Sequence, residues 1–375
     1  MNILILNFIL STAVDGKIIR RDSNRDTMIY TMARGFVSNG HTVTLAAADE
    51  FRPLKPEDEP EFTTIYFPSR APRLFKPALL PWPKGLGSYI RRHADDFDMI
   101  LSVDAFSFPT IIAARNCRSK LIVWQEMAFM QHFMKGLPAR IWYRFIAPRY
   151  IGNAPVMAQS EKARNFISKF LPNIADITVG HGSDNELFYP SDHTDTCFVV
   201  ISMLVARKQI DRIIEKFSRF LDNTDHKDFM LRIIGEGPEM DLLKKRAEDL
   251  GIKDNVRFEG FLDHRSIAGI SRHAQALLID TRQDNNMVTI PESIVNGTPV
   301  LTNMVPNNAV FIRDLDLGIA RDHWDWQDML KIVRDNTVYR QNCIKHRRLF
   351  SNNGCAESLL NAFLHDKEAP GKQFR

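Results

Sequence analysis

The chain has 375 residues, of which 44% are hydrophobic and 25% are charged. This balance is ordinary for globular proteins and excludes a disordered or fibrous class, and the length suffices for two domains of about 150–200 residues. The net charge of +4 is too small to indicate nucleic-acid binding, and the sequence has neither a helix-turn-helix, an RRM nor a zinc-finger pattern.

The four cysteines are scattered, with no C-x-x-C pair and no histidine at zinc-ligand spacing. We therefore expect reduced thiols in a cytoplasmic protein. A continuous apolar run of about 18 residues is absent, and the opening MNILILNFIL lacks the basic region and cleavage site of a signal peptide. This opening is expected to form a buried strand.

The first half of the chain alternates short apolar runs with helical lengths, including a helix expected over residues 26–38. Strands are expected at residues 3–8, 42–46, 62–67, 98–103, 121–124, 155–158 and 177–179. Strands separated by helical lengths indicate β-α units and a parallel sheet.

Residues 180–196 are polar and contain glycine and proline, as expected of an interdomain linker. A second series then follows, with strands expected at residues 197–203, 229–234, 256–259, 276–279 and 300–301 and helices at 210–221, 239–250 and 264–271. Two doubly wound halves are the economical interpretation, because no short-period repeat is present.

Two stretches of the first half, residues 73–92 and 129–150, mix aromatic, proline and basic side chains. Such mixtures are found at membrane interfaces, where each basic residue near anionic lipid contributes about 1 kcal/mol. Aromatic packing in the core and cation–π contacts explain the same composition. Both interpretations stay open.

The segment 280–301, DTRQDNNMVTIPESIVNGTPVL, indicates a loop, a helix and a strand after the apolar run 276–279. In an open parallel sheet, ligands bind at the carboxyl ends of the strands, and a helix N-terminus there favours phosphate. Asp284 and Glu292 flank this turn. From this segment alone, an ordinary crossover with two solvated acids fits equally well.

Several short motifs occur in a fixed order along the chain. They are Gly40-His41-Thr42-Val43, Gln159-Ser160-Glu161, Gly182-Ser183-Asp184, Arg207-Lys208, Gly235-Glu236-Gly237, Val256-Arg257-Phe258-Glu259-Gly260, and Asp284 with Glu292 seven residues beyond it. In this order they resemble a family 4 glycosyltransferase of the GT-B fold, whose E-x7-E signature the last pair matches with Asp in first place. The resemblance covers nearly the whole chain.

The resemblance implies a retaining, metal-independent glycosyltransferase that uses a UDP- or GDP-sugar as donor and needs no cofactor. Its anionic leaving group requires cations against the phosphates, a role that suits Arg207 and Lys208. Glu292 is implied to accept hydrogen bonds from ribose hydroxyls, and Asp284 to bind hydroxyls of the donor sugar. The ordinary alternatives are a solvated helix start for the cations and an N-cap for Asp284.

The remaining donor-site positions implied by the resemblance are mostly backbone contacts. They are Met287 and Val288 at the helix N-terminus, Gly235 and Gly237 in a tight turn, Arg257 and Phe258 in a strand beside the base, and Gly16 in a shortened N-terminal glycine loop.

Besides this shortened loop, the sequence departs from the family in three places. Met203 stands where an arginine is expected, Met287 where glycine or proline is common, and Gln125-Glu126 where a histidine usually follows the strand. Gln125 can hydrogen-bond a sugar hydroxyl, whereas Glu126 can also accept a proton, so both are candidate catalytic residues. The departures leave open a GT-B protein that binds nucleotide or glycan without turnover, and a GT-B sugar-nucleotide epimerase.

Other candidates carry less weight. The pair Asp314 and Asp316 has the D-x-D spacing of metal-dependent glycosyltransferases of another fold, and we expect no metal there. Four histidines look isolated and form no metal or nucleophile constellation: His93, His132, His181 and His264.

We therefore expect an α/β protein with two Rossmann-like doubly wound domains facing a central cleft. Residues 1–190 are expected to bind the acceptor, residues 191–348 to bind the nucleotide sugar, and a C-terminal helix within 349–375 to pack on the first domain. The expected activity is hexosyl transfer to a saccharide or lipid-linked saccharide in lipopolysaccharide or exopolysaccharide assembly. The protein is expected to be cytoplasmic, with contact to the anionic inner face of the cell membrane and none to nucleic acid.

Overall fold

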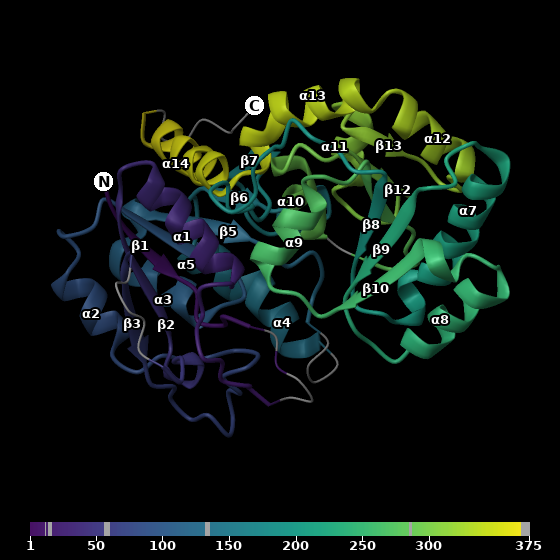
Figure 1. The fold of residues 1–375 in the computed structure, drawn as a ribbon. Coiled ribbons are helices and arrows are strands. Elements are labelled where there is room, and N and C mark those ends of the chain that lie inside the picture. Colours follow the sequence, from purple (N-terminus) through teal and green to yellow (C-terminus); the bar gives the residue numbers. More distant parts are fainter. Residues whose placement is uncertain (12, 14–16, 56–60, 132–135, 285–286, 369–375) are drawn as a thin grey trace. The chain divides into compact units, whose positions relative to one another are not determined.

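The computed structural model describes all residues other than 12, 14–16, 56–60, 132–135, 285–286 and 369–375 (Figure 1). The chain divides into two compact units. Unit 1 comprises Met1–Gly182 and Asn352–Arg375, and unit 2 comprises Ser183–Ser351.

Unit 1 contains a parallel sheet in the order β3-β2-β1-β4-β5-β6-β7. The strands are β1 (Asn2–Leu6), β2 (Thr42–Ala48), β3 (Thr63–Phe67), β4 (Met99–Val103), β5 (Leu121–Gln125), β6 (Val156–Ala158) and β7 (Ile174–Thr178). The apolar runs form strands buried on both faces, as in β1 and β5, because helices cover both sides of a parallel sheet. The strand order reverses between β1 and β4.

The helices of unit 1 come from the N-terminal half of the chain and, in α14, from its C-terminal part. They are α1 (Met28–Ser38), α2 (Leu86–Arg92), α3 (Phe108–Cys117), α4 (Leu137–Ile141), α5 (Ala147–Tyr150), α6 (Glu161–Ile167) and α14 (Asn352–Glu368), with a π-helical turn at Trp142–Ile146. Helix α14 packs closely on α1: a Cβ at Gly35 would lie 2.3 Å from the carbonyl oxygen of Asn352. The side-chain amide of Asn39 donates to the Asn353 carbonyl at 2.7 Å.

Unit 2 contains a second parallel sheet, in the order β10-β9-β8-β11-β12-β13. The strands are β8 (Cys197–Ile201), β9 (Met230–Ile234), β10 (Val256–Gly260), β11 (Ala276–Ile279), β12 (Val300–Thr302) and β13 (Gly318–Ala320). Here the order reverses between β8 and β11. Ligands of doubly wound sheets bind at such a reversal, outside the carboxyl ends of the strands.

Helices cover both faces of the second sheet. They are α7 (Ile210–Asn223), α8 (Met240–Asp249), α9 (His264–Ser271), α10 (Thr289–Val295), α11 (Ala309–Asp314), α12 (Trp326–Arg334) and α13 (Asn336–His346). Alternate side chains of β8 pack in two different cores, because successive side chains of a strand point to opposite faces of the sheet. Phe198 and Val200 pack in one core, and Cys197 and Val199 pack in the other. Each fully buried aliphatic side chain of this kind contributes about 1.5–3 kcal/mol to folding.

The expected fold class is confirmed, since each unit is a doubly wound α/β layer structure. The sequence reasoning did not anticipate β13, which has only three residues and therefore shows no periodicity. The strand expected at residues 177–179 begins earlier, at Ile174, and helix α9 has the expected bounds.

The two basic–aromatic stretches of unit 1 meet through aromatic contacts, although they lie far apart in the sequence. Phe75 packs edge-on against Phe108 at 5.0 Å between ring centroids, and Phe108 packs likewise against Trp142 at 5.1 Å. Trp142 and Tyr143 are buried. Core packing is therefore the correct interpretation for these two aromatic residues.

Candidate functional site

The candidate donor site in unit 2 is built by two loops that follow the neighbouring strands β8 and β11. The first loop contains a short 3-10 helix, Ala206–Lys208, and the second leads from Asp280 to α10. Because β8 and β11 flank the reversal of strand order, the two loops emerge side by side at the edge where ligands bind.

Backbone hydrogen bonds tie the two loops together. The carbonyl oxygen of Arg207 accepts from the backbone N–H of Arg282 at 2.8 Å and from the Thr281 hydroxyl at 3.1 Å. In return, the guanidinium of Arg207 donates to the carbonyl of Gln283 at 2.8 Å. The cations predicted from the sequence are therefore held in place by the loop that carries the predicted acids.

Lys208, Arg207 and Asp284 form one charge cluster. The Lys208 ammonium donates to Asp284 Oδ2, and Arg207 Nη1 lies 3.4 Å from the same oxygen. The side chains of Lys208 and Asp284 are 10% and 16% exposed, whereas that of Arg207 is 46% exposed. The structure thus brings together three residues that sequence reasoning had grouped only by resemblance.

A largely buried network that the sequence reasoning missed holds the start of the loop that carries Asp284. Asp280 accepts from the Lys216 ammonium at 2.6 Å and from the side-chain amide of Asn303 at 3.1 Å. The Lys216 nitrogen lies 3.8 Å from the centroid of the Trp324 ring. These contacts fix the first residue after β11, and no spacing in the sequence marks Lys216, which looks like one cation of a solvated helix face.

Glu292 lies in the first turn of α10, and its side chain is 9% exposed. His264 Nε2 lies 3.6 Å from Glu292 Oε1, because the side chain of Asp263 caps α9 and makes His264 the first residue of that helix. Burial raises the pKa of Glu292 to about 8. His264 had looked isolated in the sequence, since it lies 28 residues before its partner.

The backbone at the start of α10 is already engaged. The N–H of Met287 donates to Asn308 Oδ1 at 3.4 Å, and the Asn308 amide donates back to the Met287 carbonyl at 2.9 Å. The Met287 side chain is buried, whereas Val288 is exposed. Asn308 was not identified from the sequence, and it competes with the phosphate contact expected of the Met287 N–H.

Gly235 and Gly237 support the loop that carries the cations. Gly235 has φ +132°, and a Cβ there would lie 1.9 Å from the Ser202 carbonyl oxygen. A Cβ at Gly237 would lie 2.3 Å from the Leu204 carbonyl oxygen. The two glycines thus allow the turn after β9 to lie directly against the loop after β8.

Arg257 and Phe258 are not part of this cluster. Both lie within the edge strand β10, before its carboxyl end, and Arg257 Nε lies 3.1 Å from Glu259 on the same strand. They line a depression of about 790 Å³ together with Lys244 and Met230. Gly16, the remaining expected donor-site residue, lies outside the described part of the chain.

In unit 1, Gln125 ends β5 and is fully buried. Its side-chain oxygen accepts from the backbone N–H of Ala105 at 2.9 Å, and its side-chain nitrogen donates to the carbonyl of Met127 at 2.8 Å. The amide therefore holds the turn after β5 in shape, which differs from the sugar contact expected of it.

Glu126, the next residue, is half-exposed and lies beside two titratable groups. His181 Nε2 is 3.8 Å from Glu126 Oε1, and this imidazole lowers the pKa of Glu126. Asp104 Oδ1 accepts from the backbone N–H groups of Glu126 and Met127, both at 2.9 Å. Burial, followed by the charge of Glu126, raises the pKa of Asp104 to about 7. Neither Asp104 nor His181 had been selected from the sequence.

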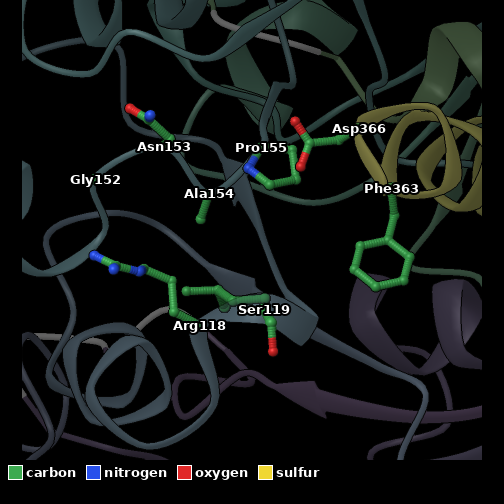
Figure 2. A pocket seen from close by; sticks show the side chains of 9 residues that line it. Arg118, Ser119, Gly152, Asn153, Ala154, Pro155, Phe363 and Asp366 are labelled. Atoms are coloured by element: carbon green, nitrogen blue, oxygen red, sulfur yellow. The ribbon is translucent and has the colours of Figure 1, made fainter. Parts of the chain in front are cut away.

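A separate hollow of about 590 Å³ lies in unit 1 at the amino ends of β5 and β6 (Figure 2). Arg118 and Pro155 contribute to it, and Phe363 and Asp366 of α14 complete its lining. It is at the opposite end of these strands from Glu126, so it is not part of the candidate site.

Two other kinds of feature, a metal site and a membrane-spanning helix, are absent from the described residues. No group of three or more His, Cys, Asp or Glu side chains could hold a metal ion within this part of the chain. Among the helices that the structure describes, none is both long and apolar enough to cross a bilayer.

Part of the chain is similar to a known protein family. Residues 186–354 match the family described as glycosyl transferases group 1. The mannosylfructose-phosphate synthase of Agrobacterium fabrum is 26% identical over 208 residues, which are 48% of this chain and 45% of that protein. The lipopolysaccharide core biosynthesis glycosyltransferase LpsE of Rhizobium meliloti is 27% identical over 174 residues, 44% of this chain and 48% of that protein.

This chain thus spans about half the length of the curated relatives it matches. Among solved structures, a glycosyltransferase from Rickettsia africae has a TM-score of 0.64 over 99% of both chains, at 14% identity. At that identity the likeness shows the fold. Residues 186–354 are therefore similar to the group 1 glycosyl transferases, and the chain as a whole has the GT-B fold.

Proposed function

We propose that this protein transfers a sugar from a nucleotide-sugar donor to a saccharide or lipid-linked saccharide acceptor. Unit 2 binds the donor, and unit 1 binds the acceptor. The observation that carries the proposal is the cluster of Lys208, Arg207 and Asp284 at the carboxyl ends of β8 and β11. Two cations held at a reversal of strand order suit a diphosphate ligand.

The charges of the cluster support a division of roles. Lys208 and Arg207 stabilise the negative charge that develops on the leaving nucleoside diphosphate. Asp284 holds the two cations in position and binds hydroxyls of the donor sugar. Because the cations supply this stabilisation, the reaction proceeds without a metal ion.

The ribose is bound by Glu292. In the ligand-free protein its raised pKa favours the neutral carboxyl group at pH 7. A carboxylate accepts both hydrogen bonds of a vicinal diol, so ribose binding favours the ionised form and releases a proton.

The transfer retains the configuration at the anomeric carbon. The acceptor hydroxyl attacks on the face from which the diphosphate leaves, and a phosphate oxygen takes the hydroxyl proton. The bond from the anomeric carbon to the phosphate oxygen breaks as the new glycosidic bond forms. Similarity to a relative named for lipopolysaccharide core biosynthesis supports an acceptor of the cell surface.

An exposed face of unit 1 supports a lipid-linked acceptor and contact with an anionic membrane. Along α4, the π-helical turn and α5, the side chains of Leu137, Ile141 and Phe145 are exposed at four-residue spacing, and Arg140 and Arg144 are exposed between them. Apolar side chains flanked by cations suit the interface of an anionic bilayer. Lys135, which belongs to the basic–aromatic stretch 129–150, lies outside the described residues.

Vesicle sedimentation tests the membrane contact. The double variant Arg140→Ala and Arg144→Ala is expected to reduce binding to vesicles with anionic lipid about 30-fold, since each cation contributes ~1 kcal/mol. Arg313→Ala with Arg334→Ala removes the same charge from unit 2 and should leave binding unchanged. Equal sedimentation of both double variants would remove the membrane contact from the proposal.

Product analysis tests the proposed activity. The protein is incubated with UDP- and GDP-sugars, with and without saccharide acceptors, and the released nucleotide and the anomeric configuration of the product are determined. Acceptor-dependent release of UDP or GDP supports transfer, and an isomerised nucleotide sugar would identify an epimerase. Nucleotide binding without any turnover would favour a binding protein. This alternative is supported by the side-chain amide of Gln125, which is already hydrogen-bonded to the backbone.

A further inference from the structure

The carboxyl edge of the sheet in unit 1 carries a second cluster of polar side chains, separate from the charge cluster of unit 2. Asp104 follows β4 directly, Glu126 follows β5 directly, and His181 comes three residues after β7. Since the carboxyl ends of parallel strands share one edge of a sheet, the three side chains converge where such sheets bind ligands.

The turn that carries Glu126 is held rigidly. One oxygen of Asp104 accepts two backbone N–H groups from the turn, and the Gln125 amide makes two further backbone contacts. Asp104 itself has φ +60°, a left-handed conformation that non-glycine residues rarely adopt, and its own N–H donates to the Trp124 carbonyl at 3.0 Å. An ordinary surface turn requires none of these side-chain contacts, and strained residues held by their surroundings gather at functional sites.

His181 is directed at Glu126 by its packing. Its ring lies edge-on against Trp124 at 5.2 Å between centroids, and the Trp124 indole N–H donates to the Val179 carbonyl at 2.8 Å, which fixes the approach of the segment. Within the part of the chain that the structure describes, the buried Nδ1 atom of His181 has no hydrogen-bond partner. A buried N–H without an acceptor is costly, so the ring proton is favoured on Nε2, the atom that faces Glu126.

Solvent reaches Glu126 but hardly reaches its partner. The side chain of Glu126 is 50% exposed and that of His181 is 11% exposed. A carboxylate backed by a buried imidazole and open on its other side is arranged to accept a hydrogen bond from a ligand hydroxyl. A ligand that binds such a carboxylate must donate a hydrogen bond to it. A saccharide can do so, because it carries many hydroxyl groups.

We propose that Glu126 binds a hydroxyl of the acceptor sugar, with His181 as the residue that positions its carboxylate and Asp104 as the anchor of its loop. This inference rests on the proposed function and deepens it, because it names the acceptor-binding residue of unit 1. His181 acts through Glu126 and does not itself touch the acceptor.

Binding of simple glycosides tests the inference without requiring turnover. Saturation-transfer NMR is recorded on the full chain with octyl glucoside, octyl galactoside and octyl mannoside, in the absence of nucleotide. Wild-type protein is expected to show transfer to at least one glycoside, and Glu126→Gln to weaken that binding about 10- to 100-fold, as expected for a charge-assisted hydrogen bond.

The positioning role of His181 is tested by two substitutions. His181→Leu removes the N–H that faces Glu126 and should weaken glycoside binding several-fold, whereas His181→Gln restores an N–H donor at a similar place and should bind nearly as wild type. His93 forms a comparable pair with Asp96 at 2.7 Å on the surface of the same unit, so His93→Leu is the matched control and should have no effect.

Thermal shifts with UDP and GDP are recorded on the same variants, because nucleotide binding belongs to unit 2. Unchanged nucleotide shifts together with weakened glycoside binding in Glu126→Gln support the inference. The inference is overturned if no glycoside binds wild-type protein, if Glu126→Gln binds glycosides as wild type does, or if His181→Gln fails as completely as His181→Leu. If neither UDP nor GDP raises the Tm of wild-type protein, the proposed donor site is contradicted instead.

Discussion

Each unit contains a glutamate that lies beside a histidine, and the two pairs differ in which partner is buried. In unit 1, Glu126 is 50% exposed and His181 is 11% exposed, at 3.8 Å. In unit 2, Glu292 is 9% exposed and His264 is 41% exposed, at 3.6 Å. The exposed and buried partners are thus exchanged between two pairs of the same composition.

The exchange reverses the protonation of the two carboxyl groups. The contact with His181 lowers the pKa of Glu126, whereas burial raises the pKa of Glu292 to about 8. At Glu126 the histidine contact outweighs the opposing effect of burial, whereas at Glu292 burial decides the charge. Glu126 is therefore ionised and able to accept a hydrogen bond from a hydroxyl, whereas Glu292 is mostly neutral at pH 7 and, in the proposed ribose contact, ionises as the ligand binds.

A third carboxylate, Asp284, extends the comparison because two cations contact it directly. Lys208→Ala should lower the turnover number about 10²- to 10³-fold, the usual cost of removing one donor that stabilises a leaving anion. Steady-state rates with the active nucleotide sugar measure this effect.

The control for Lys208→Ala is Lys253→Ala, which removes an exposed lysine from the same unit. It should leave the rate within twofold of wild type. A Lys208→Ala variant that is folded and as active as the control would exclude Lys208 from the donor site.

The substitution Glu292→Gln tests whether Glu292 and Glu126 bind different ligands. Gln resembles the neutral carboxyl group and cannot ionise, so nucleotide affinity should fall about 10- to 100-fold while the ligand-free protein remains stable. Isothermal titration calorimetry with UDP and GDP measures the change. Glu126→Gln should leave nucleotide affinity unaltered, and an equal loss in both variants would mean that the two pairs do not serve different ligands.

Nucleotide binding should release protons, because Glu292 is mostly neutral at pH 7 and must ionise to accept both ribose hydroxyls. Titrations in two buffers of different ionisation enthalpy should show close to one proton released per site. The dependence on buffer should disappear in Glu292→Gln. Identical enthalpies in both buffers for wild-type protein would show that Glu292 keeps its protonation state when nucleotide binds.

The smallest expected effect is the pH dependence of stability. Glu292 and Asp104 have raised folded-state pKa values, about 8 and about 7, so the folded state binds more protons than the unfolded state between about pH 4 and pH 8. Their contribution is full below the unfolded pKa and is lost as the pH rises through the folded pKa. The folded-state pKa of Glu126 is lowered instead, so its stabilising contribution is lost only at more acidic pH.

Ligand-free protein should accordingly have a Tm several degrees higher at pH 6 than at pH 8.5. Calorimetry at the two pH values measures the difference. Glu292→Gln should flatten the profile, and a wild-type Tm that rises over this interval would contradict the raised pKa values.

The sequence was sufficient for the fold because strands of parallel sheets are continuous apolar runs, as in residues 276–279 and 121–124. It failed for β13, which is too short to show a pattern. The acids and cations of unit 2 were found because they follow strands in a recognisable order, and the structure joins Arg207, Lys208 and Asp284 directly.

The histidine partners could not be found in this way. His181 follows Glu126 by 55 residues and His264 precedes Glu292 by 28, so each pair forms only when separate strands and helices bring its members together. The backbone contacts of Gln125 could not be predicted for a related reason: its amide bonds to Ala105 and Met127 depend on the shape of the turn after β5. Burial, which decides the charge of Glu292, is likewise a property of the packed helix α10.

Thermal unfolding with nucleotide sugars tests most directly the claim that unit 2 binds the donor through Lys208 and Glu292. A UDP- or GDP-sugar at 100 times its Kd should stabilise wild-type protein by ~2.7 kcal/mol, and Lys208→Ala and Glu292→Gln should each reduce this stabilisation at the same ligand concentration. Absence of stabilisation by every nucleotide sugar, or equal stabilisation of wild type and both variants, would contradict the account.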